Sequence, residues 1–170
     1  MSRVLVTGGV RSGKSAHAEA LLAGRTSVTY LATGPRPGPA DAEWSARVAA
    51  HRARRPATWT TVESTRITAL PAGPVLLDCL GTWLTAQLDE LDAWGGGLDE
   101  FAFGERLADL VAAVHASEDV VVVTNEVGLG VVPGHASGRL FRDLLGTVNQ
   151  RVAAVCDEVR LVVAGRVLVL

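Results

Sequence analysis

The amino-terminal end of the sequence holds residues whose types and spacing suit phosphate chemistry. Gly8 and Gly13 enclose four residues ahead of Lys14 and Ser15, and an apolar β-branched run precedes them. This is the P-loop spacing in its usual context of strand, turn and helix. Glycines let backbone N–H groups approach phosphate oxygens, and the start of the helix adds positive charge. We expect Lys14 to reach the β- and γ-phosphates of a nucleotide and Ser15 to bind Mg²⁺.

A histidine among arginines forms a second candidate site. His51 follows Arg47 by four residues, and Arg52, Arg54 and Arg55 come directly after it. A basic end of this kind is typical of a solvent-facing helix whose charges complement the helix dipole. The alternative is a cationic pocket in which a neutral imidazole meets a polyphosphate and the arginines stabilise charge at phosphorus. Without further information, the residues favour the solvent-facing interpretation.

A third candidate is Asp78, which follows the apolar run that begins at Pro74. The run resembles a Walker B strand, buried in a parallel sheet, that delivers a carboxylate to the edge of the sheet. There Asp78 would join the ligands of Mg²⁺. It can also cap the helix that follows, and the two roles are compatible.

Strands and helices must bring these residues to one edge of a sheet, and the hydrophobic patterns predict where those elements lie. We expect further strands at 28–32, 59–63, 119–124, 158–164 and 167–170, beside those that precede Gly8 and Asp78. We expect helices at 16–22, from a cap at Asp41 to Pro56, at 82–91, 98–115 and 141–155, and a weak helical turn at 65–70. The fold class is therefore α/β: a single P-loop NTPase-like domain over residues 1–170, with a mostly parallel sheet flanked by helices.

Three connecting segments follow the strands. Ala32, Thr33 and Gly34 end the second strand, where ligands gather in open parallel sheets, so we expect them beside the nucleotide. The segment 35–39 is rich in Pro and Gly and is either a surface connection or a lid. The segment 128–134 is predicted to be a shaped loop, and polar groups near it either contact substrate or only fix the loop.

The composition limits the classes of function. The 170 residues are 48% hydrophobic with a net charge of −2, which suits one globular domain and argues against a general nucleic-acid binder. The sequence has no long apolar run and no recognisable signal peptide, so we expect a cytoplasmic protein that does not bind membranes. Cys79 and Cys156 lie in apolar segments and are expected to be buried free thiols.

Several short blocks stand in an order that matches one enzyme family. They are the segments 7–15, 30–33, 46–51, 55–59, 124–128, 141–143 and 148–151, of which Thr-Asn-Glu-Val-Gly and Asn-Gln-Arg are the most specific. Together they resemble the bifunctional adenosylcobinamide kinase / adenosylcobinamide-phosphate guanylyltransferase family of cobalamin biosynthesis, over nearly the full length of the chain.

The resemblance implies two reactions. The γ-phosphoryl group of ATP or GTP goes to the aminopropanol hydroxyl of adenosylcobinamide. GTP then gives its GMP moiety to an active-site histidine, which matches His51, and the GMP passes to adenosylcobinamide phosphate to form adenosylcobinamide-GDP. A neutral imidazole is a nucleophile near pH 7, so this chemistry suits His51 and reverses the interpretation that its neighbours favour.

The resemblance also implies the binding residues and the assembly. Mg²⁺ accompanies GTP or ATP as substrate, and its ligands are Ser15 and Asp78. Lys14 and His51 are the catalytic residues. The family resemblance implies no tightly bound cofactor, and it implies a homotrimer as the assembly. The nucleotide-binding residues that match are Gly8, Gly9, Val10, Arg11, Ser12, Gly13, Lys14, Ser15, Ala32, Thr33, Gly34, Arg52, Ala53, Arg54, Arg55, Glu63 and Asp78.

Other P-loop proteins fit the sequence less well. The nearest alternative is another small-molecule P-loop kinase without guanylyl transfer, which would leave His51 without a role. A GTPase switch usually reads guanine with Asn-Lys-x-Asp, but Lys14 is the only lysine in the chain. An ABC-type ATPase needs a Leu-Ser-Gly-Gly-Gln signature, and the sequence has none.

Overall fold

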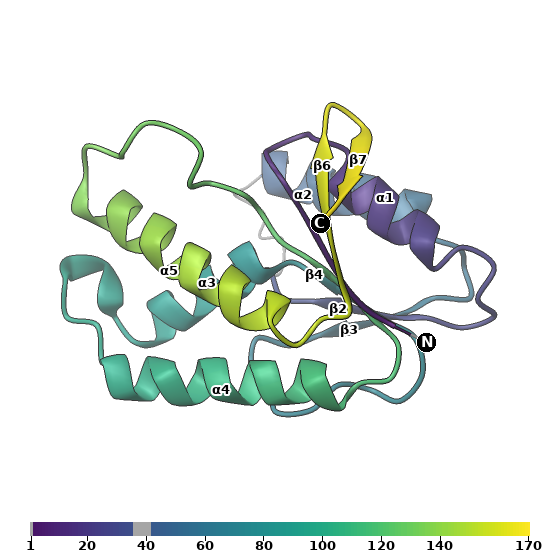
Figure 1. Ribbon diagram of the computed structural model, residues 1–170, viewed down its shortest axis with the longest axis horizontal. Helices are drawn as coiled ribbons and strands as arrows, with labels where there is room; N and C mark the ends of the chain where they lie inside the picture. Colours follow the sequence, from purple (N-terminus) through teal and green to yellow (C-terminus); the bar gives the residue numbers. More distant parts are fainter. Residues whose placement is uncertain (1, 36–41) are drawn as a thin grey trace.

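The core of the computed structural model, which describes residues 2–35 and 42–170, is a seven-stranded sheet (Figure 1). The spatial order is β3-β2-β4-β5-β1-β6-β7, and all neighbours are parallel except β6 and β7. The strands are β1 (Arg3–Gly8), β2 (Thr29–Ala32), β3 (Thr60–Glu63), β4 (Val75–Asp78), β5 (Val120–Val123), β6 (Glu158–Val163) and β7 (Arg166–Val169). The predicted α/β fold class with a mostly parallel sheet is confirmed.

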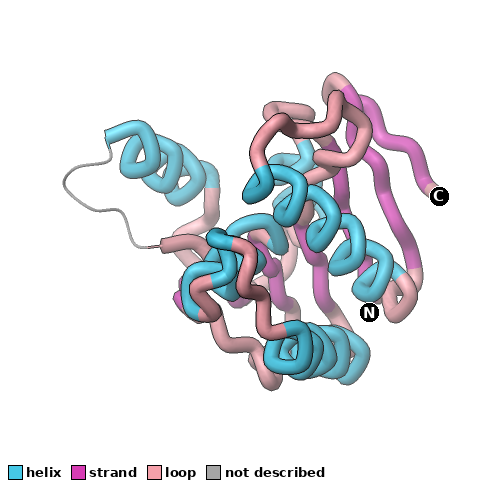
Figure 2. The backbone as a smooth tube through the Cα atoms, turned by 90° about the vertical axis from the view of Figure 1, so that its left-hand side faces the viewer, coloured by secondary structure: helices cyan, strands magenta, loops and turns pink. Residues whose placement is uncertain are grey.

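Helices cover both faces of this sheet. The helices of the described chain are α1 (Lys14–Leu21), α2 (Ala42–Arg54), α3 (Leu80–Glu90), the short 3₁₀ helix η1 (Ala93–Gly95), α4 (Glu100–Ala116) and α5 (Ala136–Ala153). Along β1, Val4 and Val6 pack with α1, whereas Leu5 packs with α3, α4 and α5. This alternation follows from the two-residue period of a strand. Figure 2 shows α2 at one side, apart from the helices that cover the sheet.

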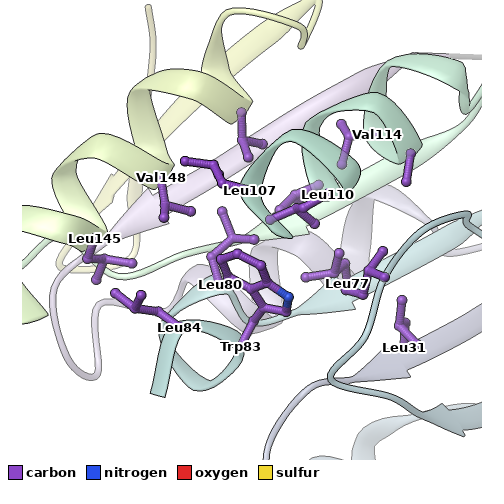
Figure 3. Close-up of a cluster of buried hydrophobic side chains, with 14 of the residues drawn as sticks. Leu31, Leu77, Leu80, Trp83, Leu84, Leu107, Leu110, Val114, Leu145 and Val148 are labelled. Atoms are coloured by element: carbon purple, nitrogen blue, oxygen red, sulfur yellow. The ribbon is translucent and has the colours of Figure 1, made fainter. Parts of the chain in front are cut away.

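The larger core lies between the sheet and α3, α4 and α5 (Figure 3). Trp83 and Leu84 of α3 meet Leu107 and Leu110 of α4 there, and all four are at most 6% exposed. Burying apolar area of this kind is the main favourable term in folding. None of the described helices is both long and apolar enough to cross a membrane.

Some predicted boundaries were wrong. The segment 65–70 is not helical, because tertiary contacts fix it instead: Ile67 is buried in the core, and Gln87 of α3 donates a hydrogen bond to the Thr65 carbonyl. Helix α3 begins at Leu80 instead of residue 82. The predicted cap at Asp41 and the segment 36–39 lie outside the described residues.

The start of α5 was also predicted too late. The helix begins at Ala136 instead of residue 141, and Gly138 lies within its first turn. A Cβ at Gly138 would come within 2.8 Å of Pro133, so this glycine lets the loop pack closely on the helix. Gly138 therefore looks like a helix breaker in the sequence, whereas in the structure it is the small residue that this packing requires.

The carboxyl ends of four strands form one edge of the sheet. Ala32 of β2 pairs with Asp78 of β4, and Asp78 pairs with Val123 of β5. Beyond the end of β5, the Glu126 amide donates to the carbonyl of Gly8 at 3.0 Å. Residues far apart in the sequence are thus brought to the edge where the phosphate loop begins.

Candidate active site

The phosphate loop turns from β1 into α1 through conformations that need glycine. Gly13 has a φ of 97° and caps α1, which begins at Lys14. At Gly8, a Cβ would lie 2.5 Å from the Val162 carbonyl oxygen, so no side chain fits there. Lys14 Nζ donates to the Gly9 carbonyl at 3.1 Å. The Lys14 ammonium therefore folds back onto the phosphate loop.

A cavity of about 740 Å³ opens in front of this loop. It lies between the loop, the ends of β2, β3 and β4, and α2. The side chains and backbone that line it include residues 10–16, Tyr30, Ala32, Gly34, His51, Arg52, Arg54, Arg55, Thr61, Glu63, Asp78 and Asn125. The structure therefore brings His51, the arginines that follow it, Lys14, Ser15 and Asp78 around one space.

His51 faces a carboxylate inside this cavity. Its Nδ1 lies 3.4 Å from Oδ2 of Asp78, and their side chains are 24% and 9% exposed. The Tyr30 hydroxyl donates a hydrogen bond of 2.8 Å to the same oxygen. Contacts between catalytic groups are often long without substrate and shorten in the complex. Asp78 is thus placed to accept a hydrogen bond from a proton on Nδ1, in which case Nε2 carries the free lone pair.

Arg55 connects this group to the backbone of α2. Its guanidinium carbon lies 3.7 Å from the centre of the Tyr30 ring, and its Nε donates to the His51 carbonyl at 3.1 Å. Arginine over an aromatic face is an attractive cation–π contact. Burial and the neighbouring Asp78 carboxylate raise the pKa of Tyr30, so its hydroxyl stays protonated and remains a donor.

Two further arginines pair with carboxylates at the rim. Arg54 donates two hydrogen bonds of 3.1 Å to Glu19 of α1, and this pairing raises the pKa of Arg54. Arg52 lies 3.6 Å from Glu63, the last residue of β3. Both arginines are about half exposed, so they can turn toward an anionic ligand in the cavity.

Four of the predicted nucleotide-binding residues do not line the cavity. Gly8 and Gly9 contribute the backbone beneath the phosphate loop, and Ala53 is exposed on α2. Thr33 is fully buried, and its hydroxyl donates to the Cys79 carbonyl at 2.7 Å. Thr33 therefore fixes the end of β2 against the start of α3, where burial raises the pKa of the Cys79 thiol.

The lining side chains that were not predicted include the polar residues Tyr30, Thr61 and Asn125. Tyr30 lies in a predicted strand and reads as a core residue. Its hydroxyl reaches Asp78 only because β2 pairs with β4 across a gap of 48 residues. Asn125 follows β5, and its place in the Thr-Asn-Glu-Val-Gly block at the end of a predicted strand could have marked it.

Comparison with known proteins identifies the family. A family model described as cobinamide kinase / cobinamide phosphate guanyltransferase matches residues 4–170. The chain is 44% identical to the bifunctional adenosylcobalamin biosynthesis protein CobU of Salmonella typhimurium, over 95% of this chain and 96% of that protein. It is 42% identical to CobU of Escherichia coli over the same shares, and 39% identical to CobP of Pseudomonas aeruginosa over 96% and 94%.

The chain belongs to the cobinamide kinase / cobinamide phosphate guanyltransferase family. The two activities of this family are therefore the activities of the enzyme, and the family resemblance seen in the sequence is confirmed.

The fold of this guanylyltransferase is also found in a known ATPase. A type III secretion system ATPase from pathogenic bacteria superposes on 94% of this chain with a TM-score of 0.56 at 14% identity. The chain covers 50% of that longer ATPase, so the likeness concerns the fold alone. It supports the P-loop NTPase-like architecture.

Proposed function

We propose that His51 is the residue that carries GMP between GTP and cobinamide phosphate. The observation behind this proposal is that His51 lines the same cavity as the phosphate loop, with its Nδ1 beside Asp78. The Nε2 lone pair attacks the α-phosphorus of GTP, a P–N bond forms, and the P–O bond to pyrophosphate breaks. A phosphate oxygen of cobinamide phosphate then attacks the same phosphorus and the P–N bond breaks, which frees His51.

The phosphates would be held by the loop and by arginines from α2. Backbone N–H groups of the loop and Lys14 meet the β- and γ-phosphates, while Arg52, Arg54 and Arg55 line the other side of the cavity. Charge that develops at phosphorus is stabilised by groups that are already in place. The same loop serves the kinase step, in which the γ-phosphoryl group of ATP or GTP passes to the cobinamide hydroxyl.

Mg²⁺ fits the oxygen donors of this cavity. The Ser15 hydroxyl and the Asp78 carboxylate both line it, and the described residues contain no cluster of three or more His, Cys, Asp or Glu side chains. Mg²⁺ is commonly held by one or two protein oxygens together with substrate phosphates and water. When bound with the nucleotide, it would neutralise phosphate charge and orient the leaving group.

We place this enzyme in the cytoplasm as a homotrimer. Both thiols of the described structure are free, which suits a reducing compartment. The β6-β7 hairpin exposes Val163, Leu168 and Leu170 at 60%, 57% and 69%. Apolar surface of this extent at a sheet edge is typical of contacts between subunits.

The decisive experiment labels the protein with GTP. The enzyme is incubated with Mg²⁺ and GTP labelled at the α- or the γ-phosphate, and is then denatured. We expect acid-labile protein-bound label from the α position only, and none in His51→Ala. Absence of label would mean that the enzyme is a kinase without guanylyl-histidine chemistry. Label from the γ position would mean that the reaction proposed for His51 is wrong.

His51→Ala also separates the two activities. Phosphorylation of cobinamide should survive at least in part, because the phosphate loop is intact. Equal loss of both activities would make His51 a structural residue.

A further inference from the structure

Two blocks of the sequence that the nucleotide chemistry does not use meet in the structure. Thr124 follows β5, and its hydroxyl donates to Oδ1 of Asn149 at 2.6 Å. The Asn149 amide donates in turn to the Asn125 carbonyl at 3.1 Å, and Arg142 donates to the Gly128 carbonyl at 3.0 Å. Helix α5 therefore holds the segment that leaves the sheet edge after β5.

A second cavity, of about 370 Å³, lies beside these contacts. The polar groups around it are both donors and acceptors of hydrogen bonds: a guanidinium, a carboxylate, a hydroxyl and an amide. Because a carboxylate and a guanidinium are both present, the lining suits a neutral polar group better than an anion. The lining residues are Gly128, Arg142, Asp143, Gly146, Thr147 and Gln150.

Gly146 is a residue that the packing of the protein does not explain. It lies in the middle of α5, where glycine stabilises a helix less than alanine does. A Cβ at this position would meet no atom of the described structure within 4 Å. Gly138 of the same helix differs, since its Cβ would press on Pro133. Gly104 of α4 is equally free of contacts, but only Gly146 lines one of the two cavities, where it leaves the helix backbone open to a molecule from outside.

The second cavity and the nucleotide site are lined by residues that lie close together in the sequence. Asn125 lines the nucleotide cavity and Gly128, three residues later, lines the second one. A stretch of three residues spans at most about 11 Å. The Glu126 amide is bonded to the Gly8 carbonyl, and the Glu126 carboxylate accepts from the Gly128 amide at 3.0 Å. The connecting segment is therefore fixed between the two cavities.

Apolar side chains stand at the start of the adjoining loop, which runs from the sheet edge to α5 in Figure 1. Leu129 and Val131 are 86% and 96% exposed. A ligand that takes polar contacts in the cavity and apolar contacts on this loop must combine neutral polar arms with an apolar body. A corrinoid has this chemistry, because its macrocycle carries apolar edges and a periphery of primary carboxamides.

The geometry points to this second cavity as the acceptor subsite, an inference that rests on the proposed function. It takes a peripheral carboxamide of cobinamide or of its phosphate, while Leu129 and Val131 contact the edge of the macrocycle. The arm bound there places the aminopropanol end toward Asn125 and the nucleotide.

The test uses two matched glycine substitutions. Gly146→Ala places a methyl group at the second cavity, whereas Gly104→Ala changes a glycine within α4 whose Cβ would also meet no atom within 4 Å. We expect both variants to raise the Tm by similar amounts, because alanine favours the helix. Only Gly146→Ala should raise the KM for cobinamide and cobinamide phosphate, by about tenfold, which is about 1.4 kcal/mol.

A second pair of variants checks the polar lining. Gln150→Ala removes an amide from the cavity, and Arg151→Ala changes the exposed neighbour that lines neither cavity. We expect a several-fold rise in the KM for cobinamide in Gln150→Ala and no change in Arg151→Ala. Labelling of the protein by GTP without acceptor should be as fast as in the unmodified enzyme for all four variants.

The outcomes separate this inference from the proposed function. An unchanged KM for cobinamide in Gly146→Ala, with the Tm raised as in Gly104→Ala, would overturn the acceptor subsite while His51 labelling persists. A change in oligomeric size in Gly146→Ala alone would overturn it too, and would make this face a contact between copies. If His51 is not labelled at all, the proposed function fails, and the KM for cobinamide in the kinase step still tests the subsite.

Discussion

Replacement of Tyr30 by phenylalanine removes one hydroxyl from the group that holds Asp78 beside His51. The hydroxyl lies 2.8 Å from Asp78 Oδ2, and Tyr30 is 5% exposed. A hydrogen bond to a charged group contributes about 1.5–3 kcal/mol to stability. For a loss of about 2 kcal/mol in a domain of this size, we expect the Tm to fall by about 4–8 °C.

The same change should slow guanylylation of His51. Without the hydroxyl, the Asp78 carboxylate is free to turn away from Nδ1, and His51 loses the partner that orients it. If the lost orientation costs about 1.4–2 kcal/mol in the transition state, the rate of labelling by α-labelled GTP falls about tenfold to thirtyfold. In the proposed mechanism, phosphorylation of cobinamide does not use His51, so its rate should fall less.

A control separates the hydroxyl from the ring. Tyr30→Phe keeps the aromatic face under the Arg55 guanidinium, whereas Tyr30→Leu removes it as well. Tyr30→Leu should therefore be the slower enzyme. A folded Tyr30→Phe enzyme that is labelled at the unmodified rate would refute the reasoning, because Asp78 would then face His51 without help from Tyr30.

Three other changes test the rest of the site. Lys14→Ala should abolish both activities, and full rate in either assay would refute a shared phosphate site. Asp78→Asn should lower turnover and alter the Mg²⁺ titration; an identical titration would leave Asp78 as a partner of His51 alone. Glu19→Gln should weaken the contact of 3.1 Å that ties Arg54 to α1. Guanylylation should slow most at low salt, because salt already screens this ion pair in the unmodified enzyme, and equal rates of the two enzymes at low salt would exclude this pair from positioning His51.

The phosphate loop and Asp78 could be predicted because short-range rules determine them. Glycine spacing, a lysine and an apolar run are local signals, and each places its residues at the end of a strand. Glu63 was predicted only from the family resemblance, and the structure puts it 3.6 Å from Arg52 on the wall of the cavity. Its role toward a nucleotide stays a prediction.

Tyr30 and the start of α5 could not be predicted because long-range contacts determine them. Tyr30 reaches Asp78 because β2 pairs with β4, and the sequence does not show this strand order, in which β4 lies between β2 and β5. Gly138 looks like a helix breaker until Pro133 is seen packed against it. His51 shows the same difference between local and long-range signals. Its basic neighbours are visible in the sequence, whereas the carboxylate beside it comes from β4 through the fold.

Ion pairs and a cation–π contact help to hold the helix that carries His51. None of the described side chains of α2 belongs to either hydrophobic core, and the helix is tied to the rest of the chain by Arg54 with Glu19, Arg52 with Glu63 and Arg55 with Tyr30. These are the arginines that also line the nucleotide cavity. A phosphate that attracts them competes with the carboxylates that hold them. Nucleotide binding and the placement of α2 are therefore coupled, and linkage requires that each affects the other equally.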